Sequence, residues 1–423
     1  MKLLKLLIAT TLLCSTNTIR AQKYVGGDIS MLPKYEEAGV VYNDKDGNAV
    51  TDVLAFFKQE GLNAMRVRLF VDPSNDNDKA VCQDLEYVKA LGKRIKDAGM
   101  KLMLDFHYSD TWADPAKQWT PDAWKALTDD QLKDTIYEYT KYCLEQMVTA
   151  GATPDFIQTG NEISFGMMWG TEAAAKNNNN NRCYINSSEA NWTRFINLLK
   201  RARQACKDVC PNAKIIIHSE RTPQPAVLTD FFDRMKEASL DYDIIGLSYY
   251  PAHHGNLATL ETALNKLEEK NYGKNIMIVE TGYCYAWPLV DDNKDGKEDG
   301  YDYTATYPYT EEGQRQYTAD LVTKLKAHES VTGLFWWWIE DNGNKSVTSR
   351  WWNAALYNHD TGKPYAAFYE LKNFNNSSSG FQDVKKEHKC KDCKWYTIEG
   401  RRLGGEPSKS GIYINNGKKK IVR

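Results

Sequence analysis

The chain has 423 residues, of which 42% are hydrophobic and 26% are charged. This balance is typical of a globular protein and excludes an intrinsically disordered chain. The 54 Lys and Arg residues almost cancel the 56 Asp and Glu residues, so we expect no nucleic-acid partner. The 12 Trp and 25 Tyr residues are a heavy aromatic content. Most of these rings fill a core, but rings exposed in a cleft are a common way to hold sugars.

The first 21 residues have the parts of a secretory signal peptide. Met1–Lys5 is basic, Leu6–Leu13 is apolar, and Ala21 is a small residue that suits cleavage. The apolar run is too short to span a bilayer. Cys14 follows it as in a lipoprotein, but Leu13 occupies the place of the small residue that a lipoprotein needs. We therefore predict an exported protein, extracellular or at the cell surface after periplasmic transit.

Export permits disulfides, and eight cysteines remain after the signal peptide. Their spacing alone does not give their pairing. They are Cys82, Cys143, Cys183, Cys206, Cys210, Cys284, Cys390 and Cys393. The last two form a C-x-x-C motif without a second pair or a His at ligand spacing, which favours a local disulfide or free thiols over a zinc site.

From residue 22 to about 374, short apolar runs alternate with longer amphipathic stretches. Several of the amphipathic stretches end at a Gly, which is a helix-termination signal. The expected strands are Tyr24–Ile29, Ala64–Leu69, Leu102–Phe106, Phe156–Thr159, Ile215–His218, Ile244–Ser248, Ile276–Val279 and Gly333–Trp337. Eight repeats of strand and helix predict an α/β fold, a (β/α)₈ TIM barrel. An open doubly wound sheet is less favoured, because no Gly-rich phosphate loop follows the first strand.

The composition changes after the barrel. Residues 375–382 are rich in Asn and Ser and predict a linker. Residues 383–423 form a basic tail with two strand-like runs, at 395–402 and 411–418. Two strands alone are marginally stable, so we expect a small β-rich C-terminal module or a sorting signal. This tail resembles the C-terminal signal of proteins exported by the type IX secretion system.

Two carboxylates directly follow apolar strands. Glu162 follows the fourth expected strand and Glu280 follows the seventh. A carboxylate at such a position is costly unless it is paired or used in chemistry. Because catalytic groups of barrel enzymes lie at the C-terminal ends of strands, the two side chains should meet over the barrel. Such a pair suits glycoside hydrolysis, and Asn161 supplies an amide for the sugar 2-hydroxyl.

Asn-Glu on the fourth strand with Glu on the seventh is the signature of clan A glycoside hydrolases. Longer stretches narrow the resemblance, and they are Gly26–Ser30, Asp105–Pro115, Gln158–Ile163 and Gly246–Pro251. Together they resemble glycoside hydrolase family 53, the endo-β-1,4-galactanases, over about residues 24–370. The resemblance implies retaining endo-hydrolysis of β-1,4-galactan, the backbone of type I arabinogalactan. It also implies that Glu162 is the acid/base and Glu280 the nucleophile.

The remaining candidates come from strand ends and from the same motifs. Arg66 and Arg68 share one face of a strand, and we expect Arg68 to hold the nucleophile ionised while Arg66 forms an ion pair inside the barrel. Tyr249 ends the sixth strand and should hydrogen-bond Glu280, which would lower the pKa of that carboxyl.

Further substrate-binding candidates are Asp105, His107, Asp110 and His218. Asp105 and His107 share a strand face, and His107 is expected to donate to a sugar hydroxyl, mainly because of its motif. Asp110 belongs to the same motif, and His218 ends the fifth strand.

Tryptophans offer a floor for the sugar. Trp112 either lines a subsite or packs the third loop. Three tryptophans at 336–338 end the last strand, and alternation turns one of them outward. The family has a Tyr-Trp-Glu-Pro run near here, which favours Trp337 as the hydrophobic floor at the cleavage point.

The run at 291–296 fits the first half of a calcium loop, with oxygen ligands at alternate positions before a Gly. The candidate ligands are Asp291, Asn293, Asp295 and Asp299. Some bacterial family members bind calcium between the seventh and eighth loops, which favours a structural Ca²⁺ ion. A polar surface loop is the alternative, because Trp352 stands where an acidic ligand would be expected. The carboxylate chemistry itself requires no cofactor.

We therefore expect a monomer that acts on a polysaccharide. A first alternative is another clan A β-glycanase, such as a β-mannanase, because the catalytic pair is shared across the clan. A second alternative is a non-catalytic glycan-binding barrel, against which the presence of both carboxylates argues.

Overall fold

The computed structural model describes residues 21–173, 181–184, 188–286, 303–348 and 351–376 of the chain. In the C-terminal tail it describes residues 382–383, 395–397, 401–403, 407, 409–415 and 418–422. Residues 1–20 of the expected signal peptide lie outside these ranges, so export stays a prediction. Among the described helices, none is long and apolar enough to cross a bilayer.

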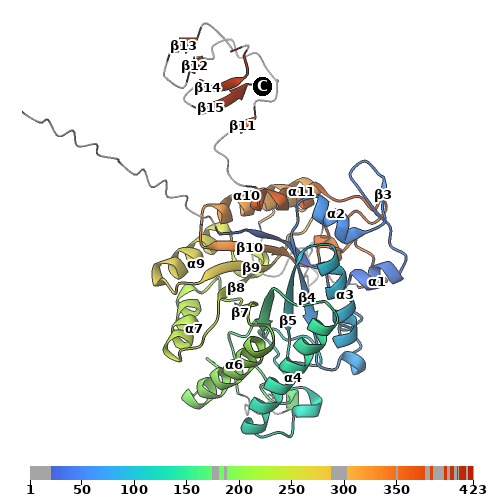
Figure 1. Cartoon of the computed structure of the whole chain (residues 1–423), viewed down its shortest axis with the longest axis vertical. Helices are drawn as coiled ribbons and strands as arrows, with labels where there is room; N and C mark the ends of the chain where they lie inside the picture. Colours follow the sequence, from blue (N-terminus) through green and yellow to red (C-terminus); the bar gives the residue numbers. More distant parts are fainter. Residues whose placement is uncertain are drawn as a thin grey trace, which may run out of the picture.

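Eight parallel strands close into a barrel in the order β1-β10-β9-β8-β7-β6-β5-β4 (Figure 1). They are β1 (Tyr24–Asp28), β4 (Ala64–Leu69), β5 (Lys101–Phe106), β6 (Phe156–Thr159), β7 (Lys214–Ser219), β8 (Ile244–Tyr249), β9 (Asn275–Thr281) and β10 (Val331–Trp336). The predicted (β/α)₈ barrel is thereby confirmed, and each strand end lies within two residues of its predicted place. The prediction missed a short hairpin between β1 and β4, formed by β2 (Tyr42–Asn43) and β3 (Ala49–Val50).

Helices surround the barrel, as Figure 1 shows. They are α1 (Leu32–Glu37), α2 (Val53–Gln59), α3 (Leu85–Asp97), α4 (Asp129–Thr149), α6 (Glu189–Val209), α7 (Pro225–Glu237), α8 (Pro251–His254), α9 (Leu257–Lys270), α10 (Glu311–Lys326) and α11 (Ala366–Leu371). Local signals set their ends. Thr128 and Gln131 form a capping box at the start of α4, and Gly99 and Gly151 follow α3 and α4 at positive φ.

Side-chain alternation divides the barrel interior into an apolar layer and a polar layer. Apolar side chains from the strands fill its lower part, and they are Ala64, Met103, Phe156, Ile216, Ile244, Met277, Val279 and Phe335. Two residues further along several strands the inward side chain is polar, as in Arg66, Asp105, Gln158 and His218. The apolar layer excludes water from below, so the polar layer above it meets a medium of low dielectric constant.

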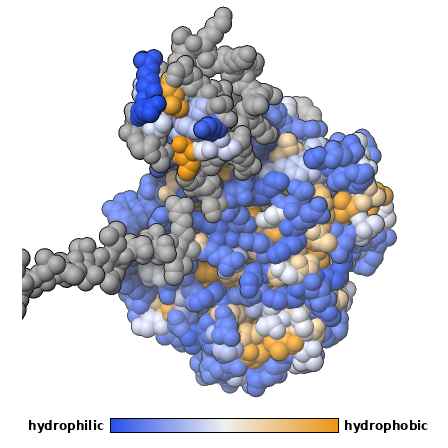
Figure 2. Space-filling view, turned by 45° about the horizontal axis from the view of Figure 1, so that its top comes forward, coloured by the Kyte–Doolittle hydropathy of each residue, from blue (hydrophilic) through white to orange (hydrophobic). Residues whose placement is uncertain are grey.

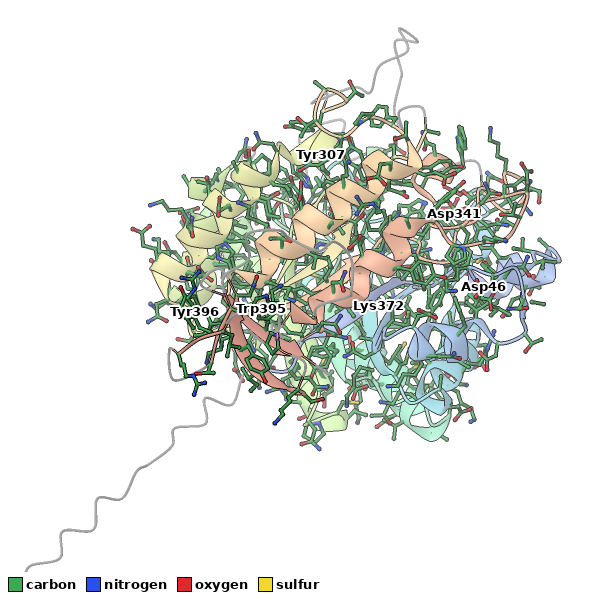
Figure 3. The ribbon with its side chains drawn as sticks, turned by 90° about the horizontal axis from the view of Figure 1, so that it is seen from above. Asp46, Tyr307, Asp341, Lys372, Trp395 and Tyr396 are labelled. Carbon is green, nitrogen blue, oxygen red and sulfur yellow. The ribbon has the colours of Figure 1, made fainter. Side chains whose placement is uncertain are left out.

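The C-terminal strands form a second sheet of order β11-β15-β14-β12-β13, outside the barrel (Figure 1). They are β11 (Gln382–Asp383), β12 (Trp395–Thr397), β13 (Arg402–Leu403), β14 (Gly411–Asn415) and β15 (Lys418–Val422). The sequence predicted a β-rich tail but only two strand-like runs. Trp395 and Tyr396, labelled in Figure 3, lie on β12, which pairs with both β13 and β14.

The surface is largely hydrophilic on the face that Figure 2 shows, with hydrophobic residues in separate patches. The six cysteines within the described ranges form no disulfide with one another. Cys390 and Cys393 lie outside these ranges, and their state stays a prediction.

Beyond β10 the chain buries two carboxyl groups under the N-terminal segment. Glu340 is fully buried, and its Oε1 accepts a hydrogen bond of 2.6 Å from the backbone N–H of Met31. Burial, and next the charge of Asp28, raise the pKa of Glu340 well above its usual value. Burial also raises the pKa of the neighbouring Asp341, labelled in Figure 3, to about 6. The folded protein therefore keeps a proton on Glu340 that the unfolded chain releases at a lower pH.

This difference predicts that Glu340→Gln stabilises the protein at high pH. Because the folded-state pKa lies above the unfolded value, the wild-type protein loses stability as pH rises above about 4.3, until the folded-state pKa is passed. Gln keeps the acceptor for Met31 but does not titrate. We expect the variant to unfold with a free energy at least about 1 kcal/mol higher than the wild type at pH 8.

Thermal melts of both proteins between pH 4 and pH 8 measure this difference. The gain in melting temperature should shrink towards zero near pH 4. A gain of equal size at every pH would contradict a proton-linked effect.

Candidate active site

A cleft of about 380 Å³ opens at the C-terminal ends of the barrel strands. Its walls come from residues that follow β5, β6, β7, β8 and β10, together with the end of β9. The lining residues are Trp112, Ala113, Asp114, Pro115, Lys117, Asn161, Glu162, Glu220, Tyr250, His253, His254, Glu280, Trp337, Trp338 and Trp351. The structure thus brings Glu162 and Glu280 into one cleft, as the sequence predicted from their strand ends.

Glu162 stands on a strained turn after β6. Its φ of 48° lies in the left-handed region that non-glycine residues avoid, and Gly160 before it has a φ of 105°. Such strain persists only where the surroundings impose it, and it concentrates at functional sites. Ser248 Oγ donates a 2.6 Å hydrogen bond to Glu162 Oε1.

The environment of Glu162 favours its protonated form. Among the ion pairs of the described residues, none includes Glu162. Burial raises its pKa well above the usual value, and the nearby charges of Glu280 and Glu220 raise it further. A carboxylic acid that keeps its proton near neutral pH can act as a general acid.

Glu280 has the opposite surroundings. The register between β8 and β9 shifts after Leu247, so that Ser248 pairs with Glu280 and Val279 is skipped. A bulge of this kind re-aims a side chain, here Glu280 beside the inward-facing Val279. Arg66 Nη2 lies 2.9 Å from Glu280 Oε1, and Tyr250 OH donates to Oε2 at 3.0 Å. Burial raises the pKa of Glu280 to about 7, and Arg66 limits the rise.

Arg66 joins several strands at the centre of the polar layer. Besides Glu280, its guanidinium pairs with Asp28 at 3.0 Å and with Asp105 at 2.7 Å. Its Nη2 also donates to Asn161 Oδ1 at 2.9 Å. The prediction that Arg66 forms an ion pair inside the barrel is confirmed. Its ion pair with Glu280 was not predicted.

Arg68 does not hold the nucleophile, contrary to the prediction. Its Nη1 pairs with Asp28 Oδ1 at 2.5 Å, and its guanidinium lies 4.8 Å and 4.9 Å from the ring centroids of Trp112 and Trp337. The guanidinium therefore supports these rings by a cation–π contact. Arg68 is two residues nearer the C-terminal end of β4, so it lies against the tryptophan rings of the cleft. Arg66 lies level with Glu280.

Tyr249 was also assigned wrongly. Its hydroxyl donates to the carbonyl of Gly255 at 2.8 Å, so it serves the turn after α8. The residue that hydrogen-bonds Glu280 is Tyr250. Alternation explains the difference, because Ser248 faces inward and Tyr249 must then face the helices. Tyr250 precedes α8, and its side chain returns to the cleft.

Three predicted sugar contacts are structural supports. Asp105 is fully buried and pairs with Arg66 and with His107 Nε2, the latter at 3.1 Å. His107 Nδ1 accepts from the backbone N–H of Ala113 at 3.1 Å, so both ring nitrogens face protein groups, and His107 is not among the residues that line the cleft. Burial lowers the pKa of His107, which keeps this ring neutral.

His218 is the third support, and it lies beneath Glu162. The backbone N–H of Glu162 donates to His218 Nδ1 at 3.2 Å, while His218 Nε2 lies 2.8 Å from Ser248 Oγ. With Nδ1 as acceptor, Nε2–H donates to Ser248, whose hydroxyl then donates to Glu162. Burial lowers the pKa of His218 well below its usual value, in agreement with this neutral form.

Asp110 lies outside the cleft. Its carboxylate accepts from the backbone N–H groups of Asp72 and Asp122, at 3.1 Å and 2.7 Å, so it fixes two loops. It lines a separate cavity of about 330 Å³ that Trp119 also lines. The motif that predicted it is therefore partly a loop-building motif.

Trp112, Trp337 and Asn161 do line the cleft, as predicted. Asn161 Nδ2 donates to the carbonyl of Ala113 at 2.8 Å, which leaves its second N–H for a ligand. The ring of Trp338 is stacked on Trp337 with 5.4 Å between centroids. Trp336, by contrast, points to the helix layer, where its Nε1 donates to the carbonyl of Ala354.

Sequence reasoning missed Tyr250, Glu220 and Trp351, which line the cleft, and Ser248, which hydrogen-bonds Glu162. Ser248 and Tyr250 lie within a motif that was recognised, and strict alternation from Ser248 identifies the first. Trp351 follows β10 by a long loop and stands in the left-handed region at a φ of 60°. No periodicity in the sequence marks it.

The predicted calcium ligands Asp291, Asn293, Asp295 and Asp299 lie outside the described residues. Within the described ranges, no group of three or more His, Cys, Asp or Glu side chains is arranged to hold a metal ion. Calcium therefore stays a prediction.

Known proteins share this fold and sequence. An endo-β-1,4-galactanase of Bacillus subtilis is 29% identical over 82% of this chain and 77% of its own length. An arabinogalactan endo-β-1,4-galactanase of Cellvibrio japonicus is 31% identical over 84% of this chain and 92% of its own. Among solved structures, the family 53 catalytic domain of Ignisphaera aggregans is 30% identical with a TM-score of 0.72, over 84% of this chain and 96% of that one.

The family model of glycosyl hydrolase family 53 matches residues 24–369, which cover the whole barrel from β1 to α11. With two carboxylates facing one cleft of that barrel, the chain belongs to glycosyl hydrolase family 53.

Proposed function

We propose that this protein is an arabinogalactan endo-β-1,4-galactanase that cleaves the β-1,4-galactan backbone with retention. One observation carries the proposal. Two carboxylates share a cleft, and their surroundings differ, since Glu280 has a cation and a phenol while Glu162 has only a hydroxyl. Surroundings that separate two pKa values in this way assign an acid and a base.

In the first step Glu280 Oε attacks the anomeric carbon and the bond to the leaving sugar breaks. Glu162 gives its proton to the glycosidic oxygen of that sugar, which leaves as an alcohol. The product is a glycosyl ester on Glu280. In the second step Glu162, now ionised, takes a proton from water, and the water oxygen replaces Glu280 at the anomeric carbon. Two displacements restore the starting configuration.

Arg66 and Tyr250 stabilise Glu280 in the ionised form that attacks the sugar. Arg66 forms an ion pair with the carboxylate of Glu280 and Tyr250 donates a hydrogen bond to it, so each stabilises its charged form before attack. Asn161 offers its free N–H to the sugar 2-hydroxyl beside the reacting carbon. Trp337 supplies an apolar face against which the ring of the bound sugar packs.

The substrate is proposed from the relatives. The two relatives described above are both named endo-β-1,4-galactanases. Together with the family match, these names favour β-1,4-galactan over β-mannan as the substrate. A non-catalytic glycan-binding barrel is disfavoured, because such a protein gains nothing from a strained, protonated Glu162.

Replacing either carboxylate should separate the two roles. On galactan, Glu162→Gln should lower kcat by about 10²–10⁴-fold, because the leaving sugar then lacks a proton donor. Glu280→Gln should lower it further, because no ester forms. On an aryl β-galactobioside, whose phenol leaves without a proton, Glu162→Gln should keep its first-step rate and Glu280→Gln should not. Reducing-end release and burst kinetics measure both steps.

Glu145→Gln is the matched control, since Glu145 is exposed on α4, away from the cleft. It should behave as wild type on both substrates. Full galactan turnover by Glu162→Gln or Glu280→Gln would overturn the role assignment, and cleavage of β-mannan but not galactan would overturn the substrate.

The hydrogen bond from Tyr250 predicts a pH effect. Tyr250→Phe removes a donor that favours the charged form of Glu280, so the pKa of this carboxyl should rise. Since the reaction needs Glu280 ionised, the acid limb of kcat/KM should move to higher pH by about one unit. Tyr249→Phe is the control, because the Tyr249 hydroxyl bonds the carbonyl of Gly255 and not Glu280, so this variant should leave the acid limb in place. If the acid limb of kcat/KM does not move in Tyr250→Phe, Tyr250 does not stabilise the charged form of Glu280.

We also propose a structural calcium ion in the loop at 291–299, on the alternating oxygen ligands of the sequence. Removing it with a chelator should lower the melting temperature. At a calcium concentration 100 times Kd, the ion would add about 2.7 kcal/mol to the free energy of unfolding. Asp295→Asn should weaken the response, with Mg²⁺ as the control ion. Equal melting with and without chelator would make this run a plain surface loop.

A further inference from the structure

A third carboxylate, Glu220, stands in the wall of the catalytic cleft. It follows β7 directly, and only 5% of the residue is exposed. Its Oε2 is buried without a hydrogen-bond partner among the described residues. A buried carboxylate with an unused acceptor is costly, so its position beside the proposed acid/base residue calls for a role.

Two neighbours fix the other oxygen of Glu220. Arg221 Nε lies 2.9 Å from Glu220 Oε1, and the hydroxyl of Ser164 donates to the same oxygen. Arg221 Nε also lies 3.2 Å from Ser164 Oγ, and its guanidinium lies 3.9 Å from the ring centroid of Phe165. Arg221 favours the charged form of Glu220 against burial, which raises its pKa.

Ser164 links Glu220 to the strained turn of Glu162. Residues at the end of β7 form hydrogen bonds to three successive residues of this turn, at positions 162 to 164. His218 accepts from the N–H of Glu162 at Nδ1, and its carbonyl accepts from the N–H of Ile163 at 3.1 Å. Glu220 then accepts from the side chain of Ser164. Because Glu162 has an unfavourable φ of 48°, these contacts hold a conformation that the turn would otherwise leave.

We propose that Glu220 is a positioning residue for the acid/base step. It holds the turn of Glu162 through Ser164, and it places a fixed negative charge beside the Glu162 carboxyl, so that this carboxyl keeps its proton until the glycosidic oxygen takes it. The proposal rests on the proposed role of Glu162 as acid/base.

Several groups face Glu162, and their effects have different directions. Glu280 on β9, Glu220 after β7 and Asp114 after β5 are acidic and favour the protonated form, with Glu280 the strongest of the three. Ser248 on β8 donates to the carboxylate and favours the charged form. Glu280 loses its charge when it becomes an ester, whereas Glu220, paired with Arg221, takes no part in the bond changes. Glu220 therefore belongs to the part of the field at Glu162 that the reaction leaves unchanged.

The alkaline limb of the pH profile tests the charge. Glu220→Gln keeps an acceptor for Ser164 and removes the negative charge, so Glu162 should lose its proton at lower pH. We expect the alkaline limb of kcat/KM to move down by about one pH unit, with the acid limb unchanged. A role limited to folding would lower the rate at every pH and leave the limb in place, and that result would overturn the proposal.

Two matched variants separate the effect of the Glu220 charge from the effect of its hydrogen bond with Ser164. Glu220→Asp keeps the charge and should keep the alkaline limb. Ser164→Ala keeps the charge but removes the link to the turn, so kcat should fall about tenfold or more while the limb stays. A limb that moves in Ser164→Ala as far as in Glu220→Gln would contradict the assignment of the effect to charge.

A direct titration covers the case in which Glu220→Gln does not fold. The proposal needs Glu220 to be charged while Glu162 still holds its proton, so Glu220 should titrate at lower pH than Glu162 in the wild type. Carbon-detected NMR of glutamate carboxyls measures both midpoints, with Glu162→Gln and Glu220→Asp to assign the signals. A Glu220 midpoint above that of Glu162 would overturn the proposal. If galactan is not cleaved, the proposed function fails, but the limb can still be measured on any β-glycoside that is.

Discussion

The buried guanidinium of Arg66 organises the active site. It has no exposure to solvent, and it contacts Asp28 on β1, Asp105 on β5, Asn161 after β6 and Glu280 on β9. A buried charge that loses its partners costs about 3–5 kcal/mol, so this side chain holds its neighbours in place. Its planar fork of donors serves several acceptors at once. Glu280, the proposed nucleophile, is thus fixed by the same group that fixes Asn161, the neighbour of Glu162.

The apolar layer beneath makes these contacts strong. Side chains such as Met103, Phe156 and Ile216 fill the barrel below the polar residues and exclude water from that side. In this medium the charge of one carboxylate is felt by the next. The acidic side chains Asp28, Asp105 and Glu280 share the cations Arg66 and Arg68, which leaves an excess of negative charge. That excess, with burial, explains why the pKa of Glu280 is raised even though it has an ion pair.

The parts of the site that follow the barrel periodicity were predictable, and the parts that depart from it were not. Glu162 and Glu280 each follow an apolar run, and the rule that catalytic groups occupy strand ends identified both. The exchange of Tyr249 for Tyr250 arose where β8 gives way to a helix, so that alternation along the strand no longer applies. Arg66 and Arg68 share a face, and their levels relative to Glu280 depend on the register of strands far apart in sequence. Glu220 was missed because its proposed role depends on its hydrogen bond with Ser164, and only the folded turn brings these two residues together.

The coupling between Glu162 and Glu280 fits the needs of the two-step reaction that we propose. In the free enzyme the charge of Glu280 raises the pKa of Glu162, so Glu162 holds the proton that the leaving sugar requires. Attack on the sugar converts Glu280 into a neutral ester, and this removes the strongest of the neighbouring charges. The pKa of Glu162 then falls, which favours the ionised form that must take a proton from water. Hydrolysis of the ester restores the charge on Glu280, and Glu162 recovers its affinity for a proton. In this proposed cycle Glu280 thereby sets the protonation state of Glu162 at each step, because both carboxyl groups face one cleft.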